Sequence, residues 1–260
     1  MAQSNRLTKA ERREQARKEA ERLRKIQEAK EKRSRRILIV VVILVVALIA
    51  AAAIVIYRQA NKTVLSDFEG PTPVAATEHG GIPFGAEGAG TRNEGAPELD
   101  LYVDFMCPAC GQFEQVNGED IATAVANGEV TVVYHPLGFL NRASQGTEYS
   151  TRSAAAFATV ATEAPDKALD FLTELFAQQP EEGSTGLTDD EVAQIAVDAG
   201  VPQDVADQIG DGTYTEWVDK ATEQAGNDGV SQTPTVKLNG EVWEGNWSQS
   251  GTLLSAIEDA

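Results

Sequence analysis

Residues 99–113 read LDLYVDFMCPACGQF and contain the only two cysteines of the chain, Cys107 and Cys110. Apolar and polar side chains alternate over residues 99–105, which is the period of a β-strand. Over residues 112–125 the pattern becomes helical. The two cysteines therefore lie where a strand passes into the N-terminus of a helix.

This position favours a reactive thiol at Cys107. Unpaired backbone N–H groups and the positive end of the helix dipole stabilise a thiolate, and Pro108 suits an early helical position because it has no N–H. A thiol of low pKa is what disulfide exchange requires.

Two other interpretations of the cysteine pair stay open at this point. A structural disulfide would close so short a loop that it would contribute only about 2 kcal/mol. A zinc site has suitable spacing at Cys107 and Cys110, but it would need His79 and His135, the only histidines, from distant positions. His135 is a candidate proton carrier, although a structural role suits it better.

Charge is distributed very unevenly along the 260 residues. Residues 1–36 carry 14 Lys and Arg against 6 Glu, whereas 8 basic and 34 acidic residues follow. Glu14/Lys18, Glu21/Lys25 and Glu28/Lys32 are spaced i,i+4, so residues 7–36 are expected to form a solvated helix. Attraction of this basic segment to anionic lipid explains its charge better than a nucleic-acid-binding arm does.

The segment that follows is apolar and long enough to span a membrane. Ile37–Ile56 holds twenty uncharged residues, which matches a bilayer core of about 30 Å at about 1.5 Å per residue. The small residues at 50–53 allow a signal-peptide cleavage site, but the apolar run continues beyond them and favours an uncleaved anchor. We expect a basic cytoplasmic segment at 1–36, a transmembrane helix at 37–57 and an extracytoplasmic remainder.

The remainder divides into a linker with domain entry at 58–97 and a domain at 98–260. Residues 66–97 contain seven Gly and four Pro, so much of this stretch is expected to be a flexible tether, with a short edge strand at 81–85. After a strand at 130–134, a helical block begins, which includes a capping box at Thr188–Glu191. Asn239-Gly240 predicts a two-residue hairpin, and residues 252–257 a last helix.

This order predicts a thioredoxin-like α/β fold with a helical insertion at about 146–227. The motifs Asp104–Cys110 (DFMCPAC), Gly229–Thr235 (GVSQTPT) and Asn239-Gly240 resemble those of DsbA-like proteins. The resemblance covers about residues 78–260 and is strongest to the membrane-anchored disulfide oxidoreductases of Gram-positive bacteria.

The resemblance implies an active site. Cys107 would be the exposed nucleophile and Cys110 its buried partner, with Pro108 and Ala109 between them in the active-site loop. Pro234 would be a cis-proline that faces the disulfide, and the Thr233 backbone would pair with an extended substrate.

The resemblance also implies a function. The protein would introduce disulfides into exported, unfolded proteins with free thiols, and a membrane quinone-linked reoxidase of the DsbB or vitamin K epoxide reductase type would reoxidise it. No cofactor, metal or nucleic-acid partner is expected. A disulfide reductase or isomerase, for example in cytochrome maturation, and a non-enzymatic adaptor are the alternatives.

Two positions depart from the family pattern. Ala109 stands where the well-known oxidase of the family has histidine, which removes one stabiliser of the thiolate. Leu101 replaces the buried carboxylate often found six residues before the first cysteine. Asp100 and Asp104 lie nearby, but the sequence assigns neither of them as the proton acceptor.

Overall fold

The computed structural model describes residues 9–60 and 62–260, so residues 1–8 of the predicted basic segment lie outside the described residues. The chain divides into two compact units, 1–62 and 63–260. The first unit is helix α1 (Lys9–Ala60). The expected pairs Glu14–Lys18 and Glu21–Lys25 form ion pairs, whereas Glu28 pairs with Arg24 instead. Helix α1 is long and apolar enough to cross a membrane, and none of the residues in its most apolar window is buried.

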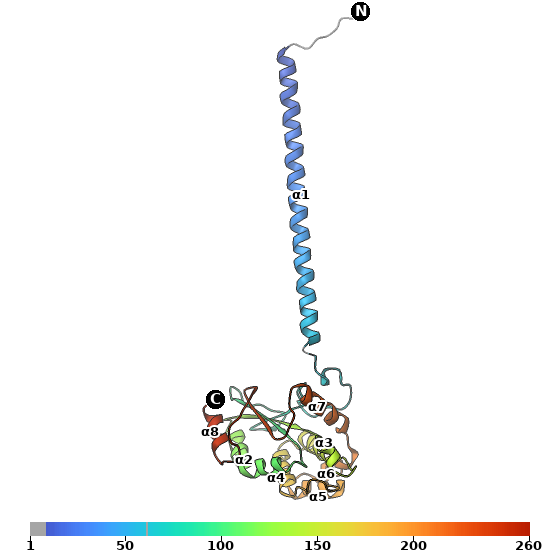
Figure 1. The fold of residues 1–260 in the computed structure, drawn as a ribbon, viewed down its shortest axis with the longest axis vertical. Helices are drawn as coiled ribbons and strands as arrows, with labels where there is room; N and C mark the ends of the chain where they lie inside the picture. The colour runs from blue at the N-terminus through green and yellow to red at the C-terminus, as the bar shows by residue number, and fades with distance from the viewer. Residues whose placement is uncertain (1–8, 61) are drawn as a thin grey trace, which may run out of the picture. The chain divides into compact units, whose positions relative to one another are not determined.

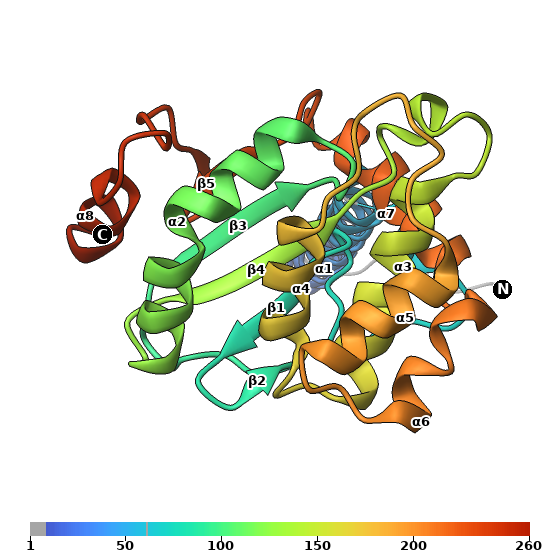
Figure 2. The ribbon, with the colours of Figure 1, turned by 90° about the horizontal axis from the view of Figure 1, so that it is seen from below.

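The second unit is built on a six-stranded sheet in the order β2-β1-β4-β3-β5-β6 (Figures 1 and 2). Strands β3 and β4 are parallel and the other pairs are antiparallel. The strands are β1 (Ile82–Gly85), β2 (Gly88–Ala89), β3 (Glu98–Val103), β4 (Thr131–Pro136), β5 (Thr235–Leu238) and β6 (Glu241–Val242).

Helices connect the strands as the thioredoxin-like prediction requires. One helix joins β3 to β4, a helical block separates β4 from β5, and a last helix follows β6. The α-helices are α2 (Pro108–Ala126), α3 (Tyr149–Glu163), α4 (Ala168–Ala177), α5 (Asp189–Asp198), α6 (Gln203–Ala206), α7 (Thr215–Asn227) and α8 (Thr252–Glu258), and the 3-10 helices are η1 (Leu65–Asp67), η2 (Asn141–Ala143) and η3 (Ile209–Asp211). The predicted α/β fold with a helical insertion is confirmed.

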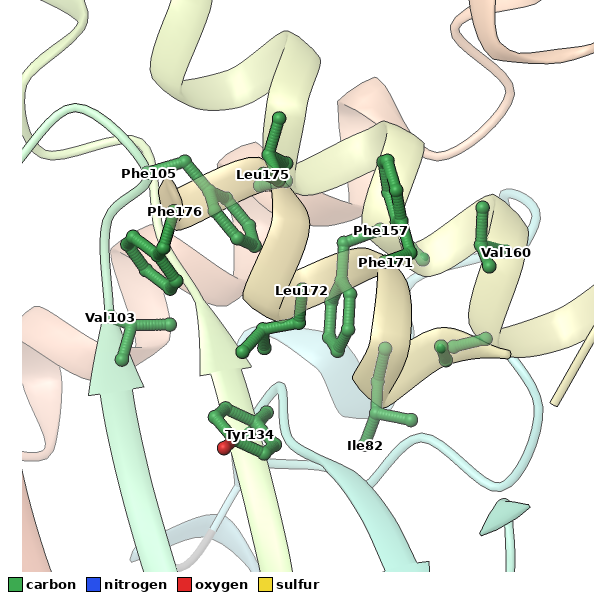
Figure 3. Packing of buried hydrophobic residues seen from close by; sticks show 14 of the residues in the cluster. Ile82, Val103, Phe105, Tyr134, Phe157, Val160, Phe171, Leu172, Leu175 and Phe176 are labelled. Atoms are coloured by element: carbon green, nitrogen blue, oxygen red, sulfur yellow. The ribbon is translucent and has the colours of Figure 1, made fainter. Parts of the chain in front are cut away.

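The large core lies between the sheet and the helices that cover one of its faces. Figure 2 shows α2 and α4 in front of the sheet, and Figure 3 shows Val103 and Tyr134 pointing from the strands toward side chains of α3 and α4. Alternation in β3 places Leu99, Leu101 and Val103 in this core, while Tyr102 belongs to a smaller cluster on the opposite face. Buried apolar side chains thus cover both faces of the sheet at β3.

Two local sequence signals determine where elements begin and turn. The capping box is confirmed, since the Thr188 hydroxyl accepts from the Glu191 N–H and the Glu191 carboxylate accepts from the Thr188 N–H. Asn239 and Gly240 both have positive φ, at 52° and 83°, as the turn between β5 and β6 requires.

Residues 66–97 differ from the flexible tether expected of them. The prediction of an edge strand at 81–85 is wrong, because β1 lies inside the sheet between β2 and β4 and its four residues are buried. Asn93 further anchors the stretch, because its side chain donates to the carbonyls of Val125 and Val130. Glycine and proline content suggested a linker, but long-range pairing and these hydrogen bonds order the segment.

Candidate active site

The two cysteines lie on the turn between β3 and α2, called here the redox turn (residues 104–111). Cys107 is the N-cap of α2, with φ −77° and ψ 115°, and Pro108 occupies the first helical turn. Cys107 is 7% exposed and Cys110 is fully buried, and both thiols are free. The helix therefore begins at Cys107, which is mostly buried and not exposed as the resemblance implies, because the Thr233 loop packs against it, and the helix carries Cys110 further inward.

The loop before β5 lies against Cys107. Strand β5 pairs with β3 so that Thr235 is opposite Tyr102, which brings the preceding residues beside the end of β3. The Thr233–Pro234 peptide bond is cis, and the Cys107 thiol donates to the Thr233 carbonyl oxygen at 3.3 Å. Residues far apart in the sequence thus meet at one sulfur atom.

The surroundings separate the two thiols in acidity. Hydrogen bonding by the Cys110 thiol, the Thr233 hydroxyl and the N–H groups of Cys110 and Ala109 lowers the pKa of Cys107 from 9.0 to about 6, although burial opposes this shift. Burial, together with the neighbouring Cys107, raises the pKa of Cys110 well above its usual value. At neutral pH, Cys107 is the thiolate and Cys110 the thiol.

The three positions considered for a proton acceptor have different surroundings in the structure. Leu101 is fully buried in the core. The Asp100 carboxylate pairs with His135 at 2.9 Å. Asp104 is fully buried, and its carboxylate accepts from the N–H groups of Met106 and Leu140, each at 2.8 Å. Burial raises the pKa of Asp104 to about 6 against the effect of these hydrogen bonds.

A groove opens beside Cys107. Its volume is about 520 Å³, and it runs between the redox turn, the segment after β4 and the loop before β5. The lining residues are Cys107, Phe139, Leu140, Glu182, Val230, Ser231, Gln232 and Thr233. An extended peptide with apolar side chains suits such a groove, because the wall offers both apolar surface and a backbone edge next to the reactive sulfur.

The histidines of the zinc alternative have other partners. His79 pairs with Asp228 at 2.7 Å, and His135, which is stacked on Tyr102, also contacts the His79 carbonyl. Within residues 9–60 and 62–260, no group of three or more His, Cys, Asp or Glu side chains is placed to hold a metal ion. The structure therefore does not bring together the four residues that the zinc alternative would need. His135 has the contacts of a structural residue.

Some residues of the site could not be found from the sequence. The sequence places Asp104 near the cysteines without assigning it a role, and it has no motif at Leu140 or Glu182. Gln179, which donates to two carbonyls of the redox turn, also lies outside any motif. One signal was present. Gly111 follows Cys110 inside a helix, and an interior helical glycine often indicates a close approach by another group.

Comparison with known proteins agrees with this geometry. A family model described as Thioredoxin matches residues 92–259, which is more than half of the chain. The chain belongs to the thioredoxin family. Among curated proteins, this family member is 33% identical over 156 residues to the serine/threonine-protein kinase PknE of Mycobacterium tuberculosis, a match that covers 57% of this chain but only 26% of the kinase.

Solved structures place this thioredoxin family member among DsbA-like proteins. Reduced DsbA from Mycobacterium tuberculosis is 28% identical with a TM-score of 0.59, covering 69% of this chain and 91% of that one. Reduced DsbG from the same organism is 31% identical with a TM-score of 0.56, covering 65% and 82%. MdbA from Actinomyces oris, at 24% identity and a TM-score of 0.61 over 76% and 96%, shares the fold. These similarities support protein disulfide oxidoreductase activity, which is exchange between thiols and disulfides.

Proposed function

We propose that the protein is a membrane-anchored, extracytoplasmic oxidase that introduces disulfides into exported proteins through its C-P-A-C site. The observation that carries the proposal is the difference in acidity and burial between the two thiols. Cys107 lies at a helix N-terminus beside the Thr233 carbonyl and has a pKa of about 6, while Cys110 is buried with a raised pKa.

The proposed reaction begins with the oxidised Cys107–Cys110 pair. A substrate thiolate attacks the Cys107 sulfur, which forms a mixed disulfide and releases Cys110 as a thiolate that takes up a proton. A second substrate thiolate then attacks the substrate sulfur of the mixed disulfide and displaces Cys107. The substrate loses two electrons and two protons as its disulfide forms, and the enzyme is left as the dithiol.

Reoxidation requires an electron acceptor. We assign this role to a membrane quinone-linked reoxidase of the DsbB or vitamin K epoxide reductase type. A helix that can cross a membrane and the DsbA-type neighbours support this assignment and support exported, unfolded proteins as substrates.

The proposed organisation keeps the segments expected from the sequence. Residues 1–36 form a basic cytoplasmic segment, 37–57 the transmembrane helix and 58–97 the linker and domain entry, of which strands β1 and β2 already belong to the sheet of the DsbA-type domain at 98–260. The basic flank before Ile37 and the candidate span in α1 support an N-terminus in the cytoplasm and a catalytic domain outside.

Single-cysteine variants of the full-length protein test the proposal. Cys110→Ser should accumulate mixed disulfides with exported proteins through Cys107, because the internal thiol that releases them is gone. Cys107→Ser should accumulate few or none, because its remaining thiol is buried. Non-reducing gels of the two variants provide the comparison. Adducts with Cys107→Ser alone would reverse the assignment, and no adducts with either variant would refute the exchange reaction.

Ala109 supports a second candidate, a reductase or isomerase. It places a methyl group where the family's oxidase has histidine, which makes a less oxidising potential possible. Equilibration of the full-length protein with glutathione measures that potential. A value near −120 mV would favour the oxidase, whereas a value near −270 mV would favour the reductase, by comparison with about these potentials for DsbA and thioredoxin.

A further inference from the structure

The side chain of Gln179 connects the end of α4 to the redox turn. Its Nε2 amide donates to the carbonyl oxygen of Phe105 at 2.9 Å and to that of Cys107 at 3.0 Å. The backbone holds Gln179 in turn, because its N–H donates to the Phe176 carbonyl at 3.2 Å. Both hydrogens of one half-buried amide are thus committed to the turn that carries the reactive sulfur.

Gly111 provides the space for this side chain. A Cβ atom built on Gly111 would lie 2.5 Å from Gln179 Oε1, which is closer than real contacts allow. Glycine is among the poorest residues for a helix interior, and Gly111 lies in the first turns of α2 without a positive φ. A side chain at this position would therefore displace the Gln179 amide, which is the movable end of its side chain, and would not strain the backbone of α2.

The Cys107 carbonyl links the Gln179 side chain to the reactive sulfur. It also accepts from the N–H groups of Cys110 at 2.9 Å and Gly111 at 3.2 Å, and so it closes the first turn of α2. The N–H groups of Ala109 and Cys110 in that turn stabilise the Cys107 thiolate. A donor that fixes this carbonyl also fixes the direction of those N–H groups.

We propose that Gln179 is a positioning residue for disulfide exchange, which holds the Phe105 and Cys107 carbonyls so that the first N–H groups of α2 stay directed at the Cys107 sulfur. Gly111 is the second half of this device, because it leaves the amide room to reach the turn. The inference rests on the proposed role of Cys107 as the reactive sulfur, but not on the direction of electron flow.

The test uses Gln179→Met in the full-length reduced protein, because methionine keeps the length of the side chain and removes both donors. The readout is the thiolate absorbance near 240 nm as a function of pH. The variant loses the two hydrogen bonds from Gln179 to the Phe105 and Cys107 carbonyls. Only part of that loss acts on the thiolate, so the pKa of Cys107 should rise by about half a unit. Gln178→Met is the matched control, since the neighbouring Gln178 is exposed and should leave the titration unchanged.

A double-mutant cycle adds a measurement that general loss of packing would not reproduce. Gly111→Ala alone should raise the pKa of Cys107 because it displaces the amide. In a Gln179→Ala background, where the space is empty, Gly111→Ala should have little further effect. This cycle also decides the matter if Gln179→Met folds poorly.

A folded Gln179→Met protein with an unchanged Cys107 titration would overturn the inference, and so would strictly additive effects in the cycle. The proposed function fails in a different way. If the titration shifts as expected but Cys110→Ser captures no exported protein, Gln179 retains its positioning role and the oxidase assignment falls.

Discussion

The Cys107 sulfur lies 3.3 Å from the carbonyl oxygen of Thr233, although the two residues are 126 positions apart in the chain. Only the thiol form of Cys107 can donate to this carbonyl. When Cys107 ionises or enters a disulfide, the carbonyl loses its partner and becomes available to an incoming backbone N–H. The same contact thus connects the redox state of the sulfur with the hydrogen-bonding capacity of the groove next to it.

Thr233 also contributes a hydroxyl that lowers the pKa of Cys107, so its side chain can be tested separately from its carbonyl. Thr233→Val should raise that pKa above about 6 by several tenths of a unit, because a similar shape is kept while the donor is lost. Thr233→Ser keeps a hydroxyl and serves as the control. The rate of iodoacetamide alkylation against pH gives the midpoint. Equal midpoints in the two variants would show that the hydroxyl has no such role.

Asp104 predicts a specific dependence of stability on pH. Its pKa is about 6 in the folded protein against 3.8 for a free side chain, so the folded state holds a proton that the unfolded state has lost. Folding stability should therefore fall as pH rises from about 4 through about 6, by about 3 kcal/mol for a two-unit shift. Asp104→Asn should remove this component, and at low pH it should be the less stable protein because one of the two acceptors is replaced by a donor.

Chemical denaturation in a Cys107→Ser background measures the effect without thiol ionisation. Glu94→Gln, at an exposed acidic residue, is the control and should keep the wild-type slope. Parallel profiles for wild type and Asp104→Asn between pH 4 and 6 would mean that Asp104 does not titrate as its burial predicts.

Glu182 predicts a charge preference among substrates. Among the described residues that line the groove, it is the one charged side chain apart from the Cys107 thiolate. Peptides with Lys or Arg next to the reactive cysteine should be oxidised faster than matched acidic peptides, by up to about fivefold at low salt, since exposed ion pairs contribute only about 0 to 1 kcal/mol. Glu182→Gln should reduce this preference, and Glu181→Gln, which removes the same charge outside the groove lining, should reduce it less. Equal losses in both variants would indicate a general field effect.

Local chemistry explains which parts of the fold were predictable. The alternation of residues 99–103, Pro108 at the start of α2 and the Asn239-Gly240 turn each act within a few residues, and the structure has these elements where the sequence placed them. A short strand at 81–85 was predictable, but only as an edge strand, because its place between β2 and β4 depends on pairing with β4, about fifty positions away. Long-range pairing of this kind leaves no periodic signal in a short strand.

The candidate site shows the same division. The C-P-A-C sequence located the sulfurs because a strand-to-helix boundary is a local feature. The contacts of Gln179 with the Phe105 and Cys107 carbonyls join positions more than 70 residues apart, and Leu140 reaches the Asp104 carboxylate from another loop. Contacts of this kind cannot be located without the fold. Only Gly111 indicates from the sequence that another group approaches α2 there.

The orientation of α1 in a membrane leads to the last prediction, which rests on the basic flank before Ile37. With 14 Lys and Arg in residues 1–36, the N-terminal side should remain in the cytoplasm and residues after Tyr57 should be outside. In a Cys107→Ser/Cys110→Ser background the chain has no cysteine, so single exposed positions can be labelled one at a time. Ser248→Cys should react with a membrane-impermeant maleimide on intact cells, whereas Ser34→Cys should react only after the cells are permeabilised. The reverse pattern would place the catalytic domain in the cytoplasm, where thiols are kept reduced, and would remove the basis for an oxidase of exported proteins.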